Sequence, residues 1–185
     1  WAVLLTQGLS ASEATKRIGN LHPVSGRMEL IPLSKGNKSE GLLAIVDYAH
    51  TPDALQNVLD TITELRSGNE TLITVVGCGG DRDMGKRPIM GDIAIKGADV
   101  VIVTDDNPRS EEPAAIRAAI LAAAPGAIEI GDRGRAIAEA VRMLGPGDAL
   151  VVAGKGHETG QIVGKTTLPF SDHEAVRTAL GDKAA

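Results

Sequence analysis

The sequence predicts an α/β fold, with a Rossmann-like, mostly parallel sheet flanked by helices and a short helical remnant of a preceding domain. Short apolar runs alternate with helical stretches along most of the chain, which is typical of βαβ crossovers. Aromatic residues make up 2% of the 185 residues and hydrophobic residues 43%. The core must therefore consist mainly of Val, Ile, Leu and Ala, which suits buried parallel strands.

The first part of the chain is expected to be helical over residues 1–19, with Ser10 capping a second helix. A joint rich in Pro, Gly and Ser follows at 22–29 and indicates a domain boundary. Because the chain opens with Trp1 inside a helical stretch, we expect it to be part of a longer protein. The predicted division is into residues 1–21 and residues 22–185.

The second part begins with an expected strand pair around the polar turn KGNKSEG, residues 35–41. Beyond this turn, strands and helices are expected to alternate, which favours a parallel sheet. The predicted strands are 28–33, 42–48, 71–77, 99–104, 127–130, 149–154 and one short strand near 160, and the predicted helices are 52–66, 88–96, 113–123, 133–144 and 172–180.

Polar clusters follow four of these strands where each strand ends. Ligands of open α/β sheets bind at the carboxyl ends of the strands, so we expect these clusters to form one cleft. The clusters are residues 47–50, 77–82, 105–109 and 154–158.

Charge and composition argue against several classes of protein. The net charge is −5 and there is no dense Lys/Arg block, which argues against a nucleic-acid partner. The apolar runs fall short of a membrane span, and the N-terminus lacks the basic start and the cleavage site of a signal peptide. A single cysteine fits a reducing cytoplasm, which is the expected location. Cys78 is the single cysteine, which excludes a disulfide framework, and no histidine pair has metal-ligand spacing.

The loop GCGGDRDMGKR lacks the spacing of a dinucleotide-binding turn, and the chain contains no P-loop. Arg82 and Arg87 are suited to binding an anion. The alternative is a solvated cluster in which Asp81, Arg82 and Asp83 pair with one another.

The segment TDDNPRSEEP combines a turn with a helix start. Ser110 and Glu112 are expected to cap the following helix. Capping does not account for Arg109, which stands beside Asp105 and Asp106 at the end of a strand. A guanidinium offers a planar fork that holds a carboxylate through two hydrogen bonds.

In the segment GKGHE, Gly154 would let the backbone approach a ligand closely. Charges of both signs follow at Lys155, His157 and Glu158. A lone histidine is more often structural than catalytic, and the roles of Lys155 and His157 stay open.

The segment DYAHTP places polar groups immediately before a helix. Thr51 as N-cap and Pro52 at the first helical position are fully explained by the helix start. Asp47, Tyr48 and His50 are candidates for contacting a nucleotide or another polar ligand.

Taken together and in their order along the chain, six segments resemble the motifs of Mur ligases of the MurE type. They are GRME, DYAHTPDAL, GCGGDRDMGKRPIMG, TDDNPRSEEP, GKGHE and FSDHE. The resemblance extends from about residue 1 to the end. Residues 106–109, Asp-Asn-Pro-Arg, resemble the diaminopimelate recognition motif. Family members that add lysine usually lack this arginine.

This resemblance implies an ATP- and Mg²⁺-dependent ligase of peptidoglycan synthesis. Such enzymes phosphorylate the terminal carboxylate of UDP-N-acetylmuramoyl-L-alanyl-D-glutamate, and the amine of meso-diaminopimelate attacks the acyl phosphate. The family has three domains. Residues 1–21 would then be the tail of the central ATP-binding domain, and residues 22–185 the C-terminal amino-acid-binding domain. A chain lacking the other domains would be inactive by itself. ATP and Mg²⁺ would be bound mainly by the missing central domain.

The resemblance also implies two sets of contacts. Arg109 would hold the distal carboxylate of the amino acid, and Asn107 and Glu158 would accept hydrogen bonds from its ammonium group. With lysine, the unpaired guanidinium would cost about 2–4 kcal/mol. The residues facing meso-diaminopimelate would be Arg82, Asp106, Asn107, Pro108, Arg109, Gly154 and Glu158, and those facing the nucleotide Arg27, Asp47, Tyr48 and His50.

Two alternatives remain open at this point. Within the family, the chain could come from a lysine-adding ligase or a folylpolyglutamate synthase. The motif DNPR argues against the first, and the pairing of GCGGDRD with GKGHE argues against the second. Outside it, the chain could be a stand-alone α/β module that binds a nucleotide or an amino acid without catalysis. A P-loop just upstream of Trp1 would favour the ligase.

Overall fold

The computed structural model describes residues 2–19, 24–31 and 43–181. Helices α1 (Ala2–Thr6) and α2 (Ala11–Gly19) contact each other. The amide of Glu13 donates to Ser10 Oγ at 3.3 Å, which confirms Ser10 as the cap of α2. Among the described residues, no helix combines the length and apolar character that crossing a membrane requires.

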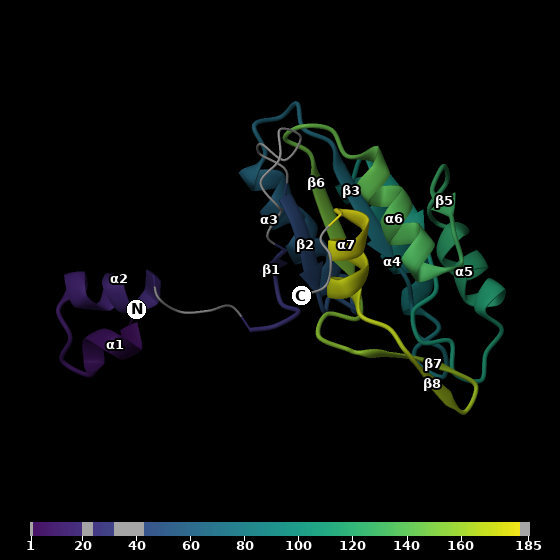
Figure 1. Cartoon of the computed structure of the whole chain (residues 1–185), viewed down its shortest axis with the longest axis horizontal. Coiled ribbons are helices and arrows are strands. Elements are labelled where there is room, and N and C mark those ends of the chain that lie inside the picture. Colours follow the sequence, from purple (N-terminus) through teal and green to yellow (C-terminus); the bar gives the residue numbers. More distant parts are fainter. Residues whose placement is uncertain (1, 20–23, 32–42, 182–185) are drawn as a thin grey trace.

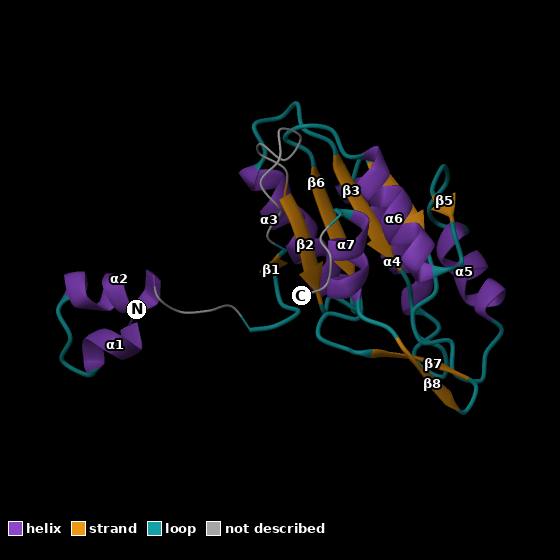
Figure 2. Cartoon of the chain, viewed as in Figure 1, coloured by secondary structure: helices purple, strands orange, loops and turns teal. Residues whose placement is uncertain are grey.

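The main sheet has six strands in the order β1-β2-β6-β3-β4-β5 (Figures 1 and 2). Only β1 runs antiparallel to its neighbour β2, and all other neighbours are parallel. The predicted fold class and the first strand pair are thus confirmed, while the predicted turn at 35–41 lies outside the described residues. The strands are β1 (Glu29–Leu30), β2 (Leu43–Asp47), β3 (Leu72–Val76), β4 (Val100–Val103), β5 (Ile128–Glu129) and β6 (Ala149–Ala153).

Helices cover both faces of this sheet (Figure 1). Alternate side chains of the buried strands point to opposite faces, so each face has its own apolar cluster. In β6, Val151 belongs to one cluster and Leu150 to the other. One face packs against α3 (Pro52–Leu65), α4 (Lys86–Gly97) and α5 (Pro113–Leu121), and the other against α6 (Arg133–Met143) and α7 (Asp172–Ala179).

After the sixth strand, the structure contains a hairpin of β7 (Gly160–Val163) and β8 (Thr166–Pro169), where the sequence predicted one short strand. All four residues of β8 are exposed, so no apolar pattern marks it. The hairpin contacts the loop after β4, because the amide of Arg109 donates to Ile162 O at 3.0 Å and the amide of Gly164 to Arg109 O at 2.7 Å. The hairpin therefore supports the position of Arg109.

Candidate functional site

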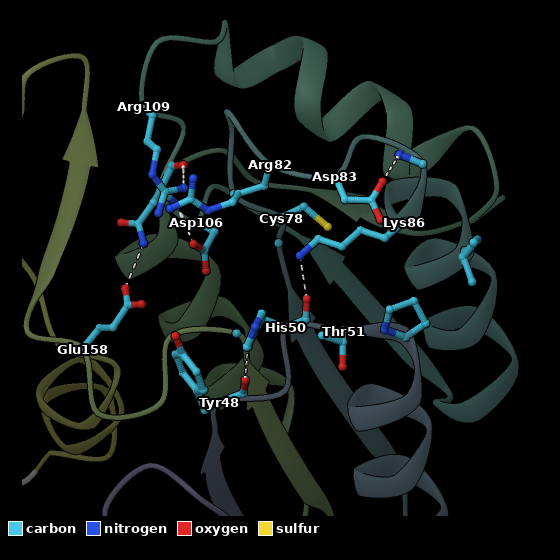
Figure 3. Close-up of a pocket in the computed structure, with 17 residues that line it drawn as sticks. Tyr48, His50, Thr51, Cys78, Arg82, Asp83, Lys86, Asp106, Arg109 and Glu158 are labelled. Atoms are coloured by element: carbon cyan, nitrogen blue, oxygen red, sulfur yellow. Dashed lines mark hydrogen bonds between the residues drawn. The ribbon is translucent and has the colours of Figure 1, made fainter.

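A cleft of about 650 Å³ lies at the carboxyl ends of the parallel strands (Figure 3). Residues from the loops after β2, β3, β4 and β6 line it, so the predicted meeting of four polar loops is confirmed. Six of the seven residues expected to face an amino acid are among them: Arg82, Asp106, Asn107, Arg109, Gly154 and Glu158.

Arg109 is fixed at its backbone and at one end of its guanidinium. Its φ of +53° is left-handed, a conformation that few residues other than glycine adopt. Nη1 donates to Gly80 O at 2.9 Å and to Asn107 O at 3.3 Å. Within the described part of the chain, Nε and Nη2 have no hydrogen-bond partner. One edge of the planar fork is thus held by protein, and the other is left for a ligand.

Pro108 does not line the cleft and instead contacts the loop after β3 through its backbone. A Cβ atom added to Gly80 would lie 1.9 Å from Pro108 O, so only glycine fits there. The amide of Gly80 also donates to Asn107 O at 2.9 Å. The loops after β3 and β4 are therefore in direct backbone contact.

Ser110 and Glu111 join the same two loops. The hydroxyl of Ser110 donates to Asp81 Oδ1 at 2.6 Å, and Ser110 is the largest cause of the lowered pKa of Asp81. Glu111 Oε1 accepts from the Asp81 amide and from buried Arg87. The predicted capping role of Ser110 is wrong, because the N-cap of α5 is Glu112, without a side-chain cap bond. Asp81 therefore pairs with the neighbouring loop rather than with Arg82.

Asn107, Lys155 and Glu158 form a closed triangle of hydrogen bonds. Lys155 Nζ donates to Asn107 Oδ1 at 2.9 Å and to Glu158 Oε2 at 3.1 Å, and Asn107 Nδ2 donates to Glu158 Oε2 at 2.8 Å. The amide of Ile162 also donates to Asn107 Oδ1 at 2.9 Å. Because Oδ1 accepts two protein hydrogen bonds, the expected contact from this oxygen to a ligand ammonium does not fit the structure.

Asp106 and Gly154 meet at the floor of the cleft. Asp106 is buried, and its Oδ1 accepts from the Asn107 amide at 2.7 Å. Gly154 has a φ of +118°, and a Cβ atom there would lie 2.9 Å from Asp106 Oδ2. Glycine therefore lets the chain pass directly beside this carboxylate.

A buried ion pair lies behind this floor. Arg133 Nε and Nη2 donate to the two carboxylate oxygens of Asp172 at 2.7 and 2.8 Å, and both side chains are fully buried. Nη2 also donates to Ala153 O, next to Gly154. Burial alone would lower the pKa of Arg133, but the charge of Asp172 raises it. No local sequence pattern indicates this pair, because its members stand 39 residues apart.

The four residues expected to face a nucleotide divide into two pairs. Tyr48 and His50 line the cleft, with ring centres 4.5 Å apart. Arg27 and Asp47 do not line it. The guanidinium of Arg27 lies 5.3 Å from the centre of the Tyr48 ring, and Asp47 Oδ2 accepts from the amide of Met28 at 2.6 Å. Asp47 thus supports the turn that carries Arg27.

Lys86 and Cys78 also line the cleft, although they are not among the predicted site residues. Lys86 Nζ donates to His50 O at 2.7 Å and joins the loops after β2 and β3. Cys78 lies beside Met90, and burial raises the pKa of its thiol to about 11, which keeps it protonated at neutral pH. The described residues contain no group of three His, Cys, Asp or Glu side chains placed to hold a metal ion.

Comparison with protein families gives a match over most of this domain. A sequence model of the family described as "Mur ligase, glutamate ligase domain" matches residues 26–156. Two curated relatives are named UDP-N-acetylmuramoyl-L-alanyl-D-glutamate--2,6-diaminopimelate ligase. The one from Agrobacterium fabrum is 58% identical over 178 residues, and the one from Rhizobium meliloti is 59% identical over 177 residues. Each alignment covers 96% of this chain, and the chain spans 35% of the length of each relative.

Solved structures give the same result. A structure of UDP-N-acetylmuramoyl-L-alanyl-D-glutamate--2,6-diaminopimelate ligase superposes with a TM-score of 0.75 at 38% identity, covering 97% of this chain and 36% of that one. A bifunctional folylpolyglutamate synthase/dihydrofolate synthase from Yersinia pestis has a TM-score of 0.59 at 21% identity, covering 83% of this chain and 34% of that one. The latter similarity concerns the fold alone.

Proposed function

We propose that this chain, which belongs to the Mur ligase, glutamate ligase domain family, is the amino-acid-binding part of a longer ligase. The intact protein would join meso-diaminopimelate to UDP-N-acetylmuramoyl-L-alanyl-D-glutamate in peptidoglycan synthesis in the cytoplasm. The names of relatives 58% and 59% identical support this substrate pair.

The observation that carries the proposal is the pairing of opposite charges on one cleft. Among the residues that the structure describes, none bonds to one edge of the Arg109 guanidinium, and Glu158 lines the same cleft. An amino-acid end group carries a carboxylate and an ammonium, which match these two side chains. Meso-diaminopimelate has such a group at both ends, whereas lysine has only an ammonium at its far end. The cleft therefore fits the distal end of meso-diaminopimelate.

The proposed reaction uses ATP to phosphorylate the terminal carboxylate of the UDP-linked dipeptide. The amine of meso-diaminopimelate then attacks this acyl phosphate, and the tetrahedral intermediate collapses to an amide and phosphate. By holding the distal end, Arg109 and Glu158 would present the proximal amine in one orientation. Such positioning removes much of the entropic part of the barrier.

ATP and Mg²⁺ would be held mainly outside this chain. Among the residues described here, Tyr48 and His50 line the cleft and would face the nucleotide, with Arg27 stacked on Tyr48. Asp47 would act indirectly, through the turn that it supports. We propose no nucleic-acid partner and no membrane insertion.

The proposed domain division places residues 1–21 in the preceding domain and 22–185 in this one. The family match that begins at residue 26 supports it. We propose that residues 1–185 alone are inactive, because the chain spans 35% of its relatives and contains no P-loop. Amide formation by the purified chain alone would contradict this.

The test uses the intact protein, the UDP-linked dipeptide and ATP, with ADP release and the amide product as readouts. We expect turnover with meso-diaminopimelate and at least about 30-fold lower kcat/KM with lysine. Equal use of lysine would overturn the substrate assignment. Binding of either amino acid without any product, with all substrates present, would favour a binding module without catalysis.

A further inference from the structure

We infer that Lys155 is a positioning residue that sets the specificity of the cleft for an ammonium group at the distal end of the amino acid. It acts by holding Asn107 and Glu158 in a single arrangement. This inference rests on the proposed function and adds to it a residue that never touches the ligand.

The first argument is the burial of the Lys155 ammonium. Its side chain is 0% exposed, and burying an unpaired charge is costly, so its hydrogen bonds define where it lies. Two of them go to Asn107 Oδ1 and Glu158 Oε2, at 2.9 and 3.1 Å. Both acceptors lie in loops that line the cleft.

Second, Lys155 and the Ile162 amide together fix the orientation of the Asn107 amide. A lysine ammonium only donates, and a carboxylate only accepts. The Asn107 side chain lies between one of each, so Oδ1 must face Lys155 and Nδ2 must face Glu158. A flipped amide would break both bonds. Without the ammonium, Asn107 would retain only the Ile162 amide as a partner for Oδ1.

The third argument concerns Glu158. Both bonds from the triangle go to Oε2, and Oε1 has no hydrogen-bond partner among the described residues. The side chain is 32% exposed, so it borders the open cleft. Oε1 is thus the acceptor left for a ligand ammonium.

The fourth argument is that the triangle keeps opposite charges apart. In an open cleft, Glu158 would otherwise be attracted to the guanidinium of Arg109 or Arg82. The ammonium of Lys155 holds Glu158 on one side, while the carbonyl oxygens of Gly80 and Asn107 hold Arg109 on the other. The two ligand-binding groups therefore stay separate, each with one side free.

The positions on either side of Lys155 require glycine. Gly154 and Gly156 on either side have φ values of +118° and +51°. A Cβ atom on Gly156 would lie 2.7 Å from both Gly26 O and Tyr48 Cβ. Glycine at both positions lets the chain pass close to these neighbours, and the Lys155 side chain between them is fully buried.

The experiment uses Lys155→Met in the intact protein with three amino acids. Meso-diaminopimelate has both distal groups, 2-aminopimelate lacks the distal amine, and lysine lacks the distal carboxylate. We expect the preference for meso-diaminopimelate over 2-aminopimelate in kcat/KM to fall about tenfold or more. The preference over lysine should change less than about threefold, because Arg109 keeps its anchors. The KM for ATP should be unchanged.

Arg109→Ala is the matched control and should give the opposite pattern, losing the preference over lysine and keeping the preference over 2-aminopimelate. If thermal unfolding shows that Lys155→Met does not fold, Lys155→Gln replaces it. That shorter side chain lacks the ammonium that Asn107 and Glu158 share, and we expect the same selective loss.

Equal losses for all three amino acids in the folded variant, or an unchanged preference over 2-aminopimelate, would overturn the inference. The wild-type protein tests the proposed function separately. A wild-type enzyme without preference for meso-diaminopimelate overturns both claims, whereas a preference that the Lys155 variants keep overturns only this one.

Discussion

The guanidinium of Arg109 donates a hydrogen bond to the carbonyl oxygen of Gly80, with Nη1 2.9 Å from that oxygen. The two residues belong to different strand-end loops, and the amide of Gly80 donates back to Asn107 O at 2.9 Å. The backbone of one loop thereby sets the position of the charged side chain of the other. The ligand-facing edge of Arg109 depends on this contact.

Gly80→Ala should therefore damage both stability and recognition. The added Cβ would meet Pro108 O at 1.9 Å, so the loops must separate. We expect a loss of about 1–3 kcal/mol in the free energy of unfolding and a raised KM for meso-diaminopimelate. Denaturant unfolding and steady-state kinetics measure both. In the control Gly134→Ala, in helix α6, the atom nearest to the added Cβ would be Asp132 Oδ1, at 3.3 Å. Similar results for the two variants would contradict this account of Gly80.

Asp172→Asn should destabilise the domain strongly, because it leaves the buried guanidinium of Arg133 without its counter-charge. We expect a loss of about 3–5 kcal/mol in the free energy of unfolding. The exposed pair of Asp92 and Lys96 provides the comparison, and Asp92→Asn should cost less than about 1 kcal/mol. A small loss for Asp172→Asn would mean that Arg133 finds another partner or water.

The Glu29 carboxylate should make the free energy of unfolding depend on pH in the acid range. Partial burial alone would raise the pKa of Glu29, but hydrogen bonds from the Gly26 amide, His173 and Ser25 together lower it below 4.5. With a lower pKa in the folded state, the stabilisation is complete above pH 4.5 and is lost as the pH falls through the folded-state value.

The measurement is the free energy of unfolding of wild type and Glu29→Gln between pH 7 and pH 3. We expect wild type to be more stable at pH 7 and the difference to shrink at the acid end. Glu64→Gln, at an exposed position of α3, is the control. A difference that grows as the pH falls would have the wrong sign for this explanation.

Much of the sheet and of its binding edge follows from the sequence, because apolar runs such as residues 72–76 mark buried strands and polar loops mark their ends. The resemblance supplied Arg109 and Glu158, and the structure places both on one cleft. Contacts between distant loops had no such signal. Ser110 has good capping chemistry, and only the fold brings Asp81, 29 residues away, within reach of its hydroxyl.

The same limit applies to Asn107 and Lys155. An asparagine in a binding motif is readily interpreted as a ligand contact, but its amide oxygen accepts from Lys155 and from the Ile162 amide of a hairpin that the sequence showed only in part. Lys155 stands between two glycines in a loop and would be expected in solvent. Its burial depends on three loops that meet in space, which local sequence patterns do not encode.

The most direct test of the central claim is the kcat/KM for meso-diaminopimelate of Arg109→Ala in the intact protein, beside the KM for ATP. We expect kcat/KM to fall about 30- to 1000-fold, because the distal carboxylate loses its only free guanidinium edge on Arg109, while the KM for ATP stays unchanged. An unchanged rate and Michaelis constant for meso-diaminopimelate would contradict the assignment of this cleft.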